Sequence, residues 1–75
     1  MIPELLRNGN SEDCGCPEQE WVFRGLHITI HAEEDGTGHT IIDAGDWDHE
    51  IWSKNADLPS MLTKAVEWVG LLEEE

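Results

Sequence analysis

Cysteine, basic residues and long apolar runs are all scarce in this chain of 75 residues. Its only cysteines are Cys14 and Cys16, which excludes a framework of several disulfides. Lys and Arg together number only 4, and this argues against direct binding to nucleic acid or to an anionic membrane. No apolar run approaches the roughly 18 residues that a membrane span needs.

The start of the chain also lacks a leader pattern. Met1 is followed by Ile-Pro-Glu, without the basic segment and apolar segment of a secretory signal. We therefore expect a soluble, cytoplasmic chain. A chain this short buries only about 60% of the surface that its unfolded form exposes, so we expect a thin core.

Alternation of apolar and polar residues predicts the first strand. In residues 26–32 the even positions are apolar and the odd positions polar, which is the period of a half-buried strand. Residues 35–38, Asp-Gly-Thr-Gly, have turn chemistry and lead into a second apolar segment at 39–44. This order predicts a β-hairpin.

The apolar pattern also suggests how the two strands of this hairpin pair. We expect Ile30 to lie opposite Ile42, and Ile28 opposite Ala44, with a loop of about three residues. A slip of one residue would instead place Ile28 against Asp43, on the wrong face of the sheet.

Two further elements follow the hairpin. Gly45 interrupts the second strand as a bend would, and residues 47–52 fit a bent extension or a third short strand. Asp57 is suited to cap a helix and Pro59 to lie in its first turn. The expected C-terminal helix carries an apolar stripe at helical spacing, formed by Leu58, Leu62, Ala65, Val66, Val69 and Leu72.

The first twenty residues predict little regular structure. Residues 2–7 fit one or two helical turns, and residues 8–20 have the Gly, Pro and Asn content of a loop or mobile arm. We therefore divide the chain into an arm at 1–20 and a β-β(-β)-α domain at 21–75. The predicted fold is α+β: a small antiparallel hairpin or three-stranded sheet packed by one C-terminal helix, with a short N-terminal helical turn.

The charge is strongly one-sided. Acidic residues number 17 and the formal net charge is −13. Between Arg24 and Lys54 there is no basic residue, and neighbouring acids about 7 Å apart repel by roughly 0.6 kcal/mol in water. The acids in this window are Glu33, Glu34, Asp35, Asp43, Asp46, Asp48 and Glu50.

Strand geometry gives part of this window a shape. Residues two apart project to the same side of a strand, so Asp46, Asp48 and Glu50 are expected to form a row. Such a row presents to a basic groove the regularly spaced negative charge of a nucleic-acid backbone. Trp47 and Trp52 lie among these acids and have the composition of interface anchors. The alternative is a hydrated surface that keeps a small protein soluble.

Cysteine and histidine residues suggest a different site. Cys14 and Cys16, with His27 and a carboxylate, have the ligand types of zinc, although a single residue between the cysteines is fewer than zinc pairs usually have. His27 and His31 lie about 13 Å apart on one strand, so one zinc ion does not bind both. The alternative is two free thiols.

Catalytic motifs are lacking. The sequence contains no phosphate-binding glycine loop, no nucleophile elbow and no His-Glu-x-x-His. A hairpin under one helix also offers little concavity in which to shift the pKa of a catalytic group. We expect a protein that is not an enzyme.

These features favour a small acidic module that binds a basic protein surface. In size and charge the chain resembles the acidic inhibitors of phages and mobile elements, such as DNA mimics directed at restriction, CRISPR or DNA-repair enzymes. The acidic window, with Trp47 and Trp52 inside it, favours a partner that is a nucleic-acid-binding protein, and we expect no cofactor. The partner-binding residues that we predict are Glu33, Glu34, Asp35, Asp43, Asp46, Trp47, Asp48, Glu50 and Trp52.

Two other functions stay open. One is a small accessory module stabilised by zinc at Cys14 and Cys16, and the other is a generic acidic domain adapted to high salt. The chain is expected to be a monomer, or a homodimer that pairs through an exposed hairpin edge.

Overall fold

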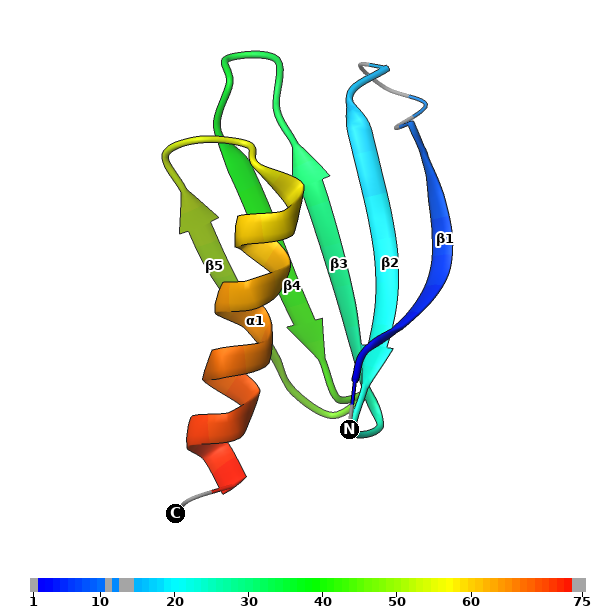
Figure 1. Ribbon diagram of the computed structural model, residues 1–75, viewed down its shortest axis with the longest axis vertical. Coiled ribbons are helices and arrows are strands. Elements are labelled where there is room, and N and C mark those ends of the chain that lie inside the picture. Colours follow the sequence, from blue (N-terminus) through cyan, green and yellow to red (C-terminus); the bar gives the residue numbers. More distant parts are fainter. Residues whose placement is uncertain (1, 11, 13–14, 74–75) are drawn as a thin grey trace.

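The computed structural model describes residues 2–10, 12 and 15–73, with the side chain of Glu73 excepted. This part of the chain forms one antiparallel sheet of five strands, with a single helix packed on one of its faces (Figure 1). The strands lie side by side in chain order, so each is joined to the next by a hairpin connection. In order, the elements are β1 (Glu4–Asn10), β2 (Pro17–Phe23), β3 (Leu26–Ala32), β4 (Gly38–Asp43), β5 (Asp48–Ser53) and α1 (Leu58–Glu73).

The predicted α+β class and C-terminal helix are confirmed, but the N-terminal helical turn is wrong. Residues 4–10 instead form β1, which pairs antiparallel with β2 and has a register shift between Leu5 and Arg7. An isolated helix of one or two turns is marginal in water. The same residues gain a ladder of hydrogen bonds along β2, and the Arg7 side chain forms ion pairs with Glu18 and Glu20 across it.

The sheet is also wider than predicted. Residues 17–20, expected in a loop or arm, begin β2 and pair with β3, where Gln19 lies opposite Ile30 and Trp21 opposite Ile28. The predicted three-stranded sheet corresponds to β3, β4 and β5, and β1 and β2 extend it on one side.

The predicted pairing of β3 with β4 is wrong by two residues. Ile28 lies opposite Ile42, and Ile30 opposite Thr40. The connection occupies residues 33–37, where the Glu33 N–H donates to the Thr37 carbonyl at 2.8 Å and the Gly36 N–H to the Glu33 carbonyl at 3.1 Å. This turn is longer than the expected loop of about three residues. As a result, β4 begins at Gly38, which lies opposite Ala32.

The predicted bend at Gly45 is present, and β5 follows it. Gly45 has a φ of 96°, a value that favours glycine. Its N–H donates to the Asp43 Oδ1 at 2.7 Å, which fixes the chain direction between β4 and β5.

The start of α1 agrees with the sequence. The Asp57 carbonyl accepts the first helical hydrogen bond from the Met61 N–H at 2.9 Å, and the Asp57 carboxylate accepts a hydrogen bond from the Ser60 hydroxyl. Pro59 lies in the first turn, where its missing N–H is not needed.

The core lies between α1 and the β3–β4 part of the sheet. Its buried members come from β2, β3, β4 and α1, and the helix contributes Met61, Ala65 and Val69. Met61 was not part of the predicted apolar stripe. A Cβ atom at Gly38 would lie only 2.6 Å from the Met61 Cε. The Met61 side chain therefore packs in this position because Gly38 has no side chain. The buried set is Phe23, Ile28, Ile30, Ile42, Met61, Ala65 and Val69.

Candidate functional site

The candidate site is the sheet face that α1 does not cover, here called the open face. Successive residues of a strand point to opposite faces, and directly paired residues of adjacent strands share a face. Because Ile28, Ile30 and Ile42 point into the core, their neighbours in sequence point away from the helix. By this alternation the open face carries Glu4, Arg7, Gly9, Glu18, Glu20, Val22, His27, Thr29, His31, His39, Ile41, Asp43, Asp48, Glu50 and Trp52.

Only two of the three acids in the expected row lie on the same strand. Asp48 and Glu50 lie on β5 and share the open face with Trp52, which is 57% exposed. Asp46 precedes the strand and belongs to the exposed bend after Gly45. The row on β5 is therefore Asp48, Glu50 and Trp52.

Asp43 joins this group from the neighbouring strand. It lies directly opposite Asp48 in the pairing of β4 with β5, which brings two acids together on one face. Like charges at such a position destabilise a sheet. Asp43 also has a structural role, because its carboxylate accepts the hydrogen bond from Gly45.

The other predicted acids lie in the β3–β4 turn. The Asp35 Oδ1 accepts hydrogen bonds from the Thr37 hydroxyl at 2.6 Å and from the Thr37 N–H at 3.0 Å. The hydroxyl bond is the main reason that the pKa of Asp35 is lowered from its ordinary value. Asp35 therefore shapes the turn, Glu34 beside it is exposed, and Glu33 reaches toward the open face.

The two predicted tryptophan anchors have different surroundings. Trp47 is 41% exposed and packs edge-on against Trp68 of α1, with ring centroids 6.0 Å apart. His49 stacks on the same Trp68 ring at 4.2 Å. Trp47 is thus partly covered by Trp68, whereas Trp52 lies on the open face.

Sequence reasoning missed the contribution of β1 and β2. Arg7 forms an ion pair with Glu18, its Nη2 lying 3.2 Å from Oε2, and a second with Glu20. The guanidinium is the main reason that the pKa of Glu20 is lowered, and the hydrogen bond to Glu20 in turn raises the pKa of Arg7. The alternation of Glu18, Glu20 and Val22 with Gln19, Trp21 and Phe23 was the available signal for this strand.

Histidines were also missed as members of this face. The His27 Nε2 lies 3.2 Å from the Glu20 Oε1, and the His31 Nε2 lies 3.3 Å from the Glu33 Oε1. His39 lies directly opposite His31 on β4. The open face therefore combines carboxylates with imidazoles, and Arg7 is its one arginine among the described residues.

A shallow hollow of about 380 Å³ lies in the middle of the open face. Side chains from β2, β3, β4, β5 and the β3–β4 turn converge on it, so it depends on the whole sheet rather than on one segment. They are Glu18, Thr29, His31, Glu33, His39, Ile41 and Glu50.

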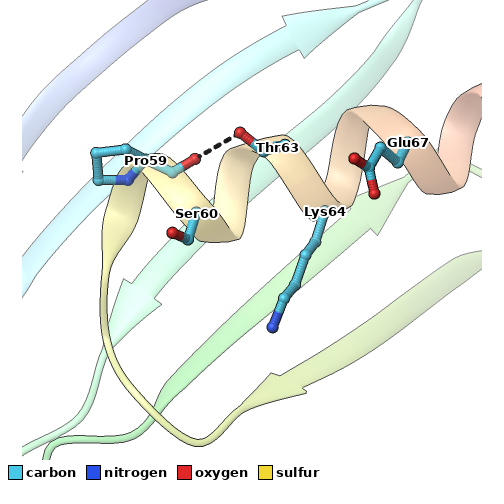
Figure 2. A pocket seen from close by; sticks show the side chains of 5 residues that line it. All are labelled: Pro59, Ser60, Thr63, Lys64 and Glu67. Carbon is cyan, nitrogen blue, oxygen red and sulfur yellow. Dashed lines mark hydrogen bonds between the residues drawn. The ribbon is translucent and has the colours of Figure 1, made fainter.

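A second hollow, of about 400 Å³, lies along the outer side of α1. Figure 2 shows that Pro59, Ser60, Thr63, Lys64 and Glu67, which line it, all come from this one helix. The Thr63 hydroxyl is already bonded to the Pro59 carbonyl at 3.0 Å. Nothing from the sheet closes this hollow, and we do not assign it a role.

The described residues offer no set of metal ligands that supports the zinc alternative. Cys14 lies outside the described residues, Cys16 is half-buried before β2, and His27 contacts Glu20. Within residues 2–10, 12 and 15–73, no three His, Cys, Asp or Glu side chains are grouped closely enough to bind a metal ion.

The described part of the chain also contains no helix with the length and apolar character to cross a membrane. Comparisons of the chain with known protein families, with curated protein sequences and with solved structures found no match.

Proposed function

We propose that this chain is a small acidic binding module that docks its open face on a basic, nucleic-acid-binding surface of a partner protein and blocks that surface by charge mimicry. The observation that carries the proposal is the concentration of carboxylates on the one sheet face that the helix leaves uncovered. On β5 and β4 these carboxylates belong to Asp43, Asp48 and Glu50. Glu50 lies near His39, whose Nδ1 is 3.6 Å from its Oε1, and the ion pairs of Arg7 are with Glu18 and Glu20.

The sheet supports mimicry because it fixes the spacing of the charges. Asp48 and Glu50 are two residues apart on one strand, which separates their Cα atoms by about 6.6 to 6.8 Å. Adjacent strands lie about 4.8 Å apart, so Asp43 extends the same array sideways. A rigid array of negative charge loses little conformational entropy on binding, and opposite charge on the partner accelerates the encounter.

Trp52 gives the array an anchor. It is the more exposed of the two tryptophans that were predicted to contact a partner, and it lies on the same face as Asp48 and Glu50. Tryptophan is enriched among the residues that dominate binding energies, and its ring attracts the cationic side chains of a basic partner.

The proposal is tested by capture of a basic partner and by displacement of nucleic acid from it. The immobilised chain is used to capture nucleic-acid-binding proteins from a lysate, and each captured protein is then tested for loss of DNA or RNA binding when the chain is added. The variant Asp48→Asn/Glu50→Gln removes two charges from the open face, and Glu12→Gln/Glu67→Gln removes two exposed charges elsewhere.

We expect the Asp48→Asn/Glu50→Gln variant to lose capture and displacement while the Glu12→Gln/Glu67→Gln control retains them. Equal losses in both would show that overall charge, and not the open face, is responsible. Unchanged capture by the open-face variant would refute the proposal.

Adaptation to high salt remains the second explanation of the charge. It is separated from the first by melting the chain at low and at molar salt. A chain that is folded only at molar salt needs no partner to explain its acidity, whereas we expect a cooperative transition already at low salt.

A further inference from the structure

The sheet has two edges, and only β5 has the regular backbone of an edge that accepts another strand. β1 and β5 are the outermost strands (Figure 1), so each has a row of backbone N–H and C=O groups that faces away from the sheet. The pairing of β1 with β2 has a register shift between Leu5 and Arg7, an irregularity of the kind that turns an edge away from further pairing. The pairing of β5 with β4 is continuous from Asp48 to Ser53, and β5 contains no proline.

The charges along β5 are complementary to those of a second β5. Two identical strands that pair antiparallel are related by a two-fold axis, so each residue before the axis lies opposite the residue equally far after it. With Ile51 on the axis, Asp48 lies three residues before it and Lys54 three residues after it. Lys54 is exposed directly after the end of β5. Asp48 of each copy therefore faces Lys54 of the other.

The alternative registers of such a pair are less favourable. An axis between two residues would place open-face side chains opposite covered-face side chains, because paired residues share a face. An axis at Glu50 places that carboxylate opposite its own copy, and an axis at His49 places Asp48 opposite Glu50, both of which are destabilising contacts of like charge. An axis at Trp52 pairs only residues 51–53 within the two strands, whereas the axis at Ile51 pairs residues 49–53.

The register centred on Ile51 also brings apolar side chains together on both faces. Ile51, which is half-buried at the margin of the core, lies opposite Ile51 of the second copy. Trp52, which is 57% exposed, lies opposite Glu50 of the second copy and loses exposed surface. Each α1 packs on β3 and β4, so the two helices lie on one side of the joined sheet, roughly 19 Å apart, without overlapping.

We propose that β5 is a dimerisation edge, to which a second copy of this chain adds its own β5 antiparallel, with Ile51 at the two-fold axis. Backbone hydrogen bonds join the two five-stranded sheets into one, and the two pairs of Asp48 with Lys54 set the register. The two open faces become one continuous surface. Self-association needs no basic partner, so it is measured independently of the proposed function.

The net charge opposes this association at low salt. Each copy carries a formal charge of −13, and two such chains repel one another at long range. Salt screens this repulsion, since the Debye length falls from about 10 Å at 0.1 M to about 3 Å at 1 M. The backbone ladder does not depend on charge. We therefore expect the dimer to become more stable as salt is added.

The test is sedimentation equilibrium of the chain over a series of protein concentrations, at low and at molar salt, with a reductant present so that no disulfide links the copies. We expect an equilibrium between monomer and dimer that shifts toward the dimer as salt is raised. A chain that stays monomeric at every concentration and every salt overturns the proposal.

Charge variants test the register, at an ionic strength of about 0.15 M where contacts between charges are only partly screened. Asp48→Lys and Lys54→Asp each place like charges opposite one another, and each is expected to weaken the dimer on the order of tenfold. Asp48→Lys should do so although it lowers the net negative charge. The double variant Asp48→Lys/Lys54→Asp restores opposite charges in reverse and is expected to recover most of the affinity.

The matched control is Lys64→Asp, on the outer side of α1. It changes the net charge as much as Lys54→Asp does, and it is expected to weaken the dimer only slightly. Circular dichroism shows that each variant is folded. Equal weakening by Lys64→Asp and Lys54→Asp would overturn the assignment of the edge, because overall charge would then explain both. A folded double variant that does not recover the affinity would overturn the register.

Discussion

The two faces of this sheet are built from the same strands and differ in what they contact. On the covered face, Ile28, Ile30 and Ile42 are fully buried under α1. On the open face, their immediate neighbours in sequence include His27, Thr29, His31, Ile41 and Asp43. Stability therefore depends on one set of alternate residues, and the other set is available for recognition. Substitutions on the two faces should have effects of different size and kind.

The largest expected effect is on the covered face. Ile42→Ala removes a fully buried side chain from the core and should lower the free energy of unfolding by about 2 to 5 kcal/mol. Ile41→Ala, one position away on the open face, should lower it by less than about 1 kcal/mol. Urea denaturation of both variants measures the difference. Equal losses would contradict the assignment of the two faces.

The next effect tests the close approach of the sheet to α1. Gly38→Ala adds a methyl group 2.6 Å from the Met61 Cε and should destabilise the fold by about 1 to 3 kcal/mol. At Gly70 of α1 an added Cβ meets nothing within 4 Å, so Gly70→Ala should stabilise by about 0.5 to 1 kcal/mol. Thermal melting of the two variants should show shifts of opposite sign. A wild-type melting temperature for Gly38→Ala would show that Met61 moves aside freely.

A smaller effect, of opposite sign, is expected on the open face. Asp48→Asn removes the repulsion with Asp43, its direct partner on β4, and should stabilise the fold by about 0.2 to 1 kcal/mol at low salt. The gain should shrink as salt is added, because exposed charges are screened. A destabilised variant at low salt would show that Asp48 has a structural partner.

The dependence of stability on pH tests the attachment of β1. Arg7 lowers the pKa of Glu20 below its ordinary value of 4.5, so this carboxylate stabilises the fold above that pH. The contribution is lost as the pH falls through the lowered pKa of the folded chain. In Arg7→Gln we expect a smaller loss of stability on acidification below pH 4.5, measured by denaturation at a series of pH values. An unchanged pH profile would show that Arg7 does not stabilise the ionised Glu20.

The covered face was the more predictable of the two. Alternation in residues 26–32 and helical spacing in residues 58–72 identified β3 and α1, because burial imposes a period on the sequence. The β3–β4 register was wrong by two residues for a physical reason. A shift of two keeps every side chain on its face, so the apolar pattern does not choose between the two registers. The hydrogen bonds of the turn at 33–37 make that choice.

The open face was less predictable because its members come from strands without a strong pattern of their own. β1 contains Asn8, Gly9 and Asn10, which are poor strand formers, and it depends on its ladder with β2. Acidic charge alone predicted Asp48 and Glu50 as partner-binding residues. It also predicted Asp35, whose carboxylate instead accepts hydrogen bonds from Thr37 within a turn. The grouping of Glu18, His31 and His39 in one hollow depends on the pairing of three strands, which periodicity within each segment does not specify.

The most direct test of the central claim is to map where a basic ligand touches the chain. An NMR titration of the isotopically labelled chain with an oligoarginine peptide, used as a basic probe, reports the backbone amides and the indole N–H of each tryptophan. We expect the shifts to concentrate on Thr29, His39, Ile41 and Glu50 and on the Trp52 indole, while the amides of α1 stay nearly unchanged. Shifts spread evenly over both faces, or centred on α1, would contradict the account.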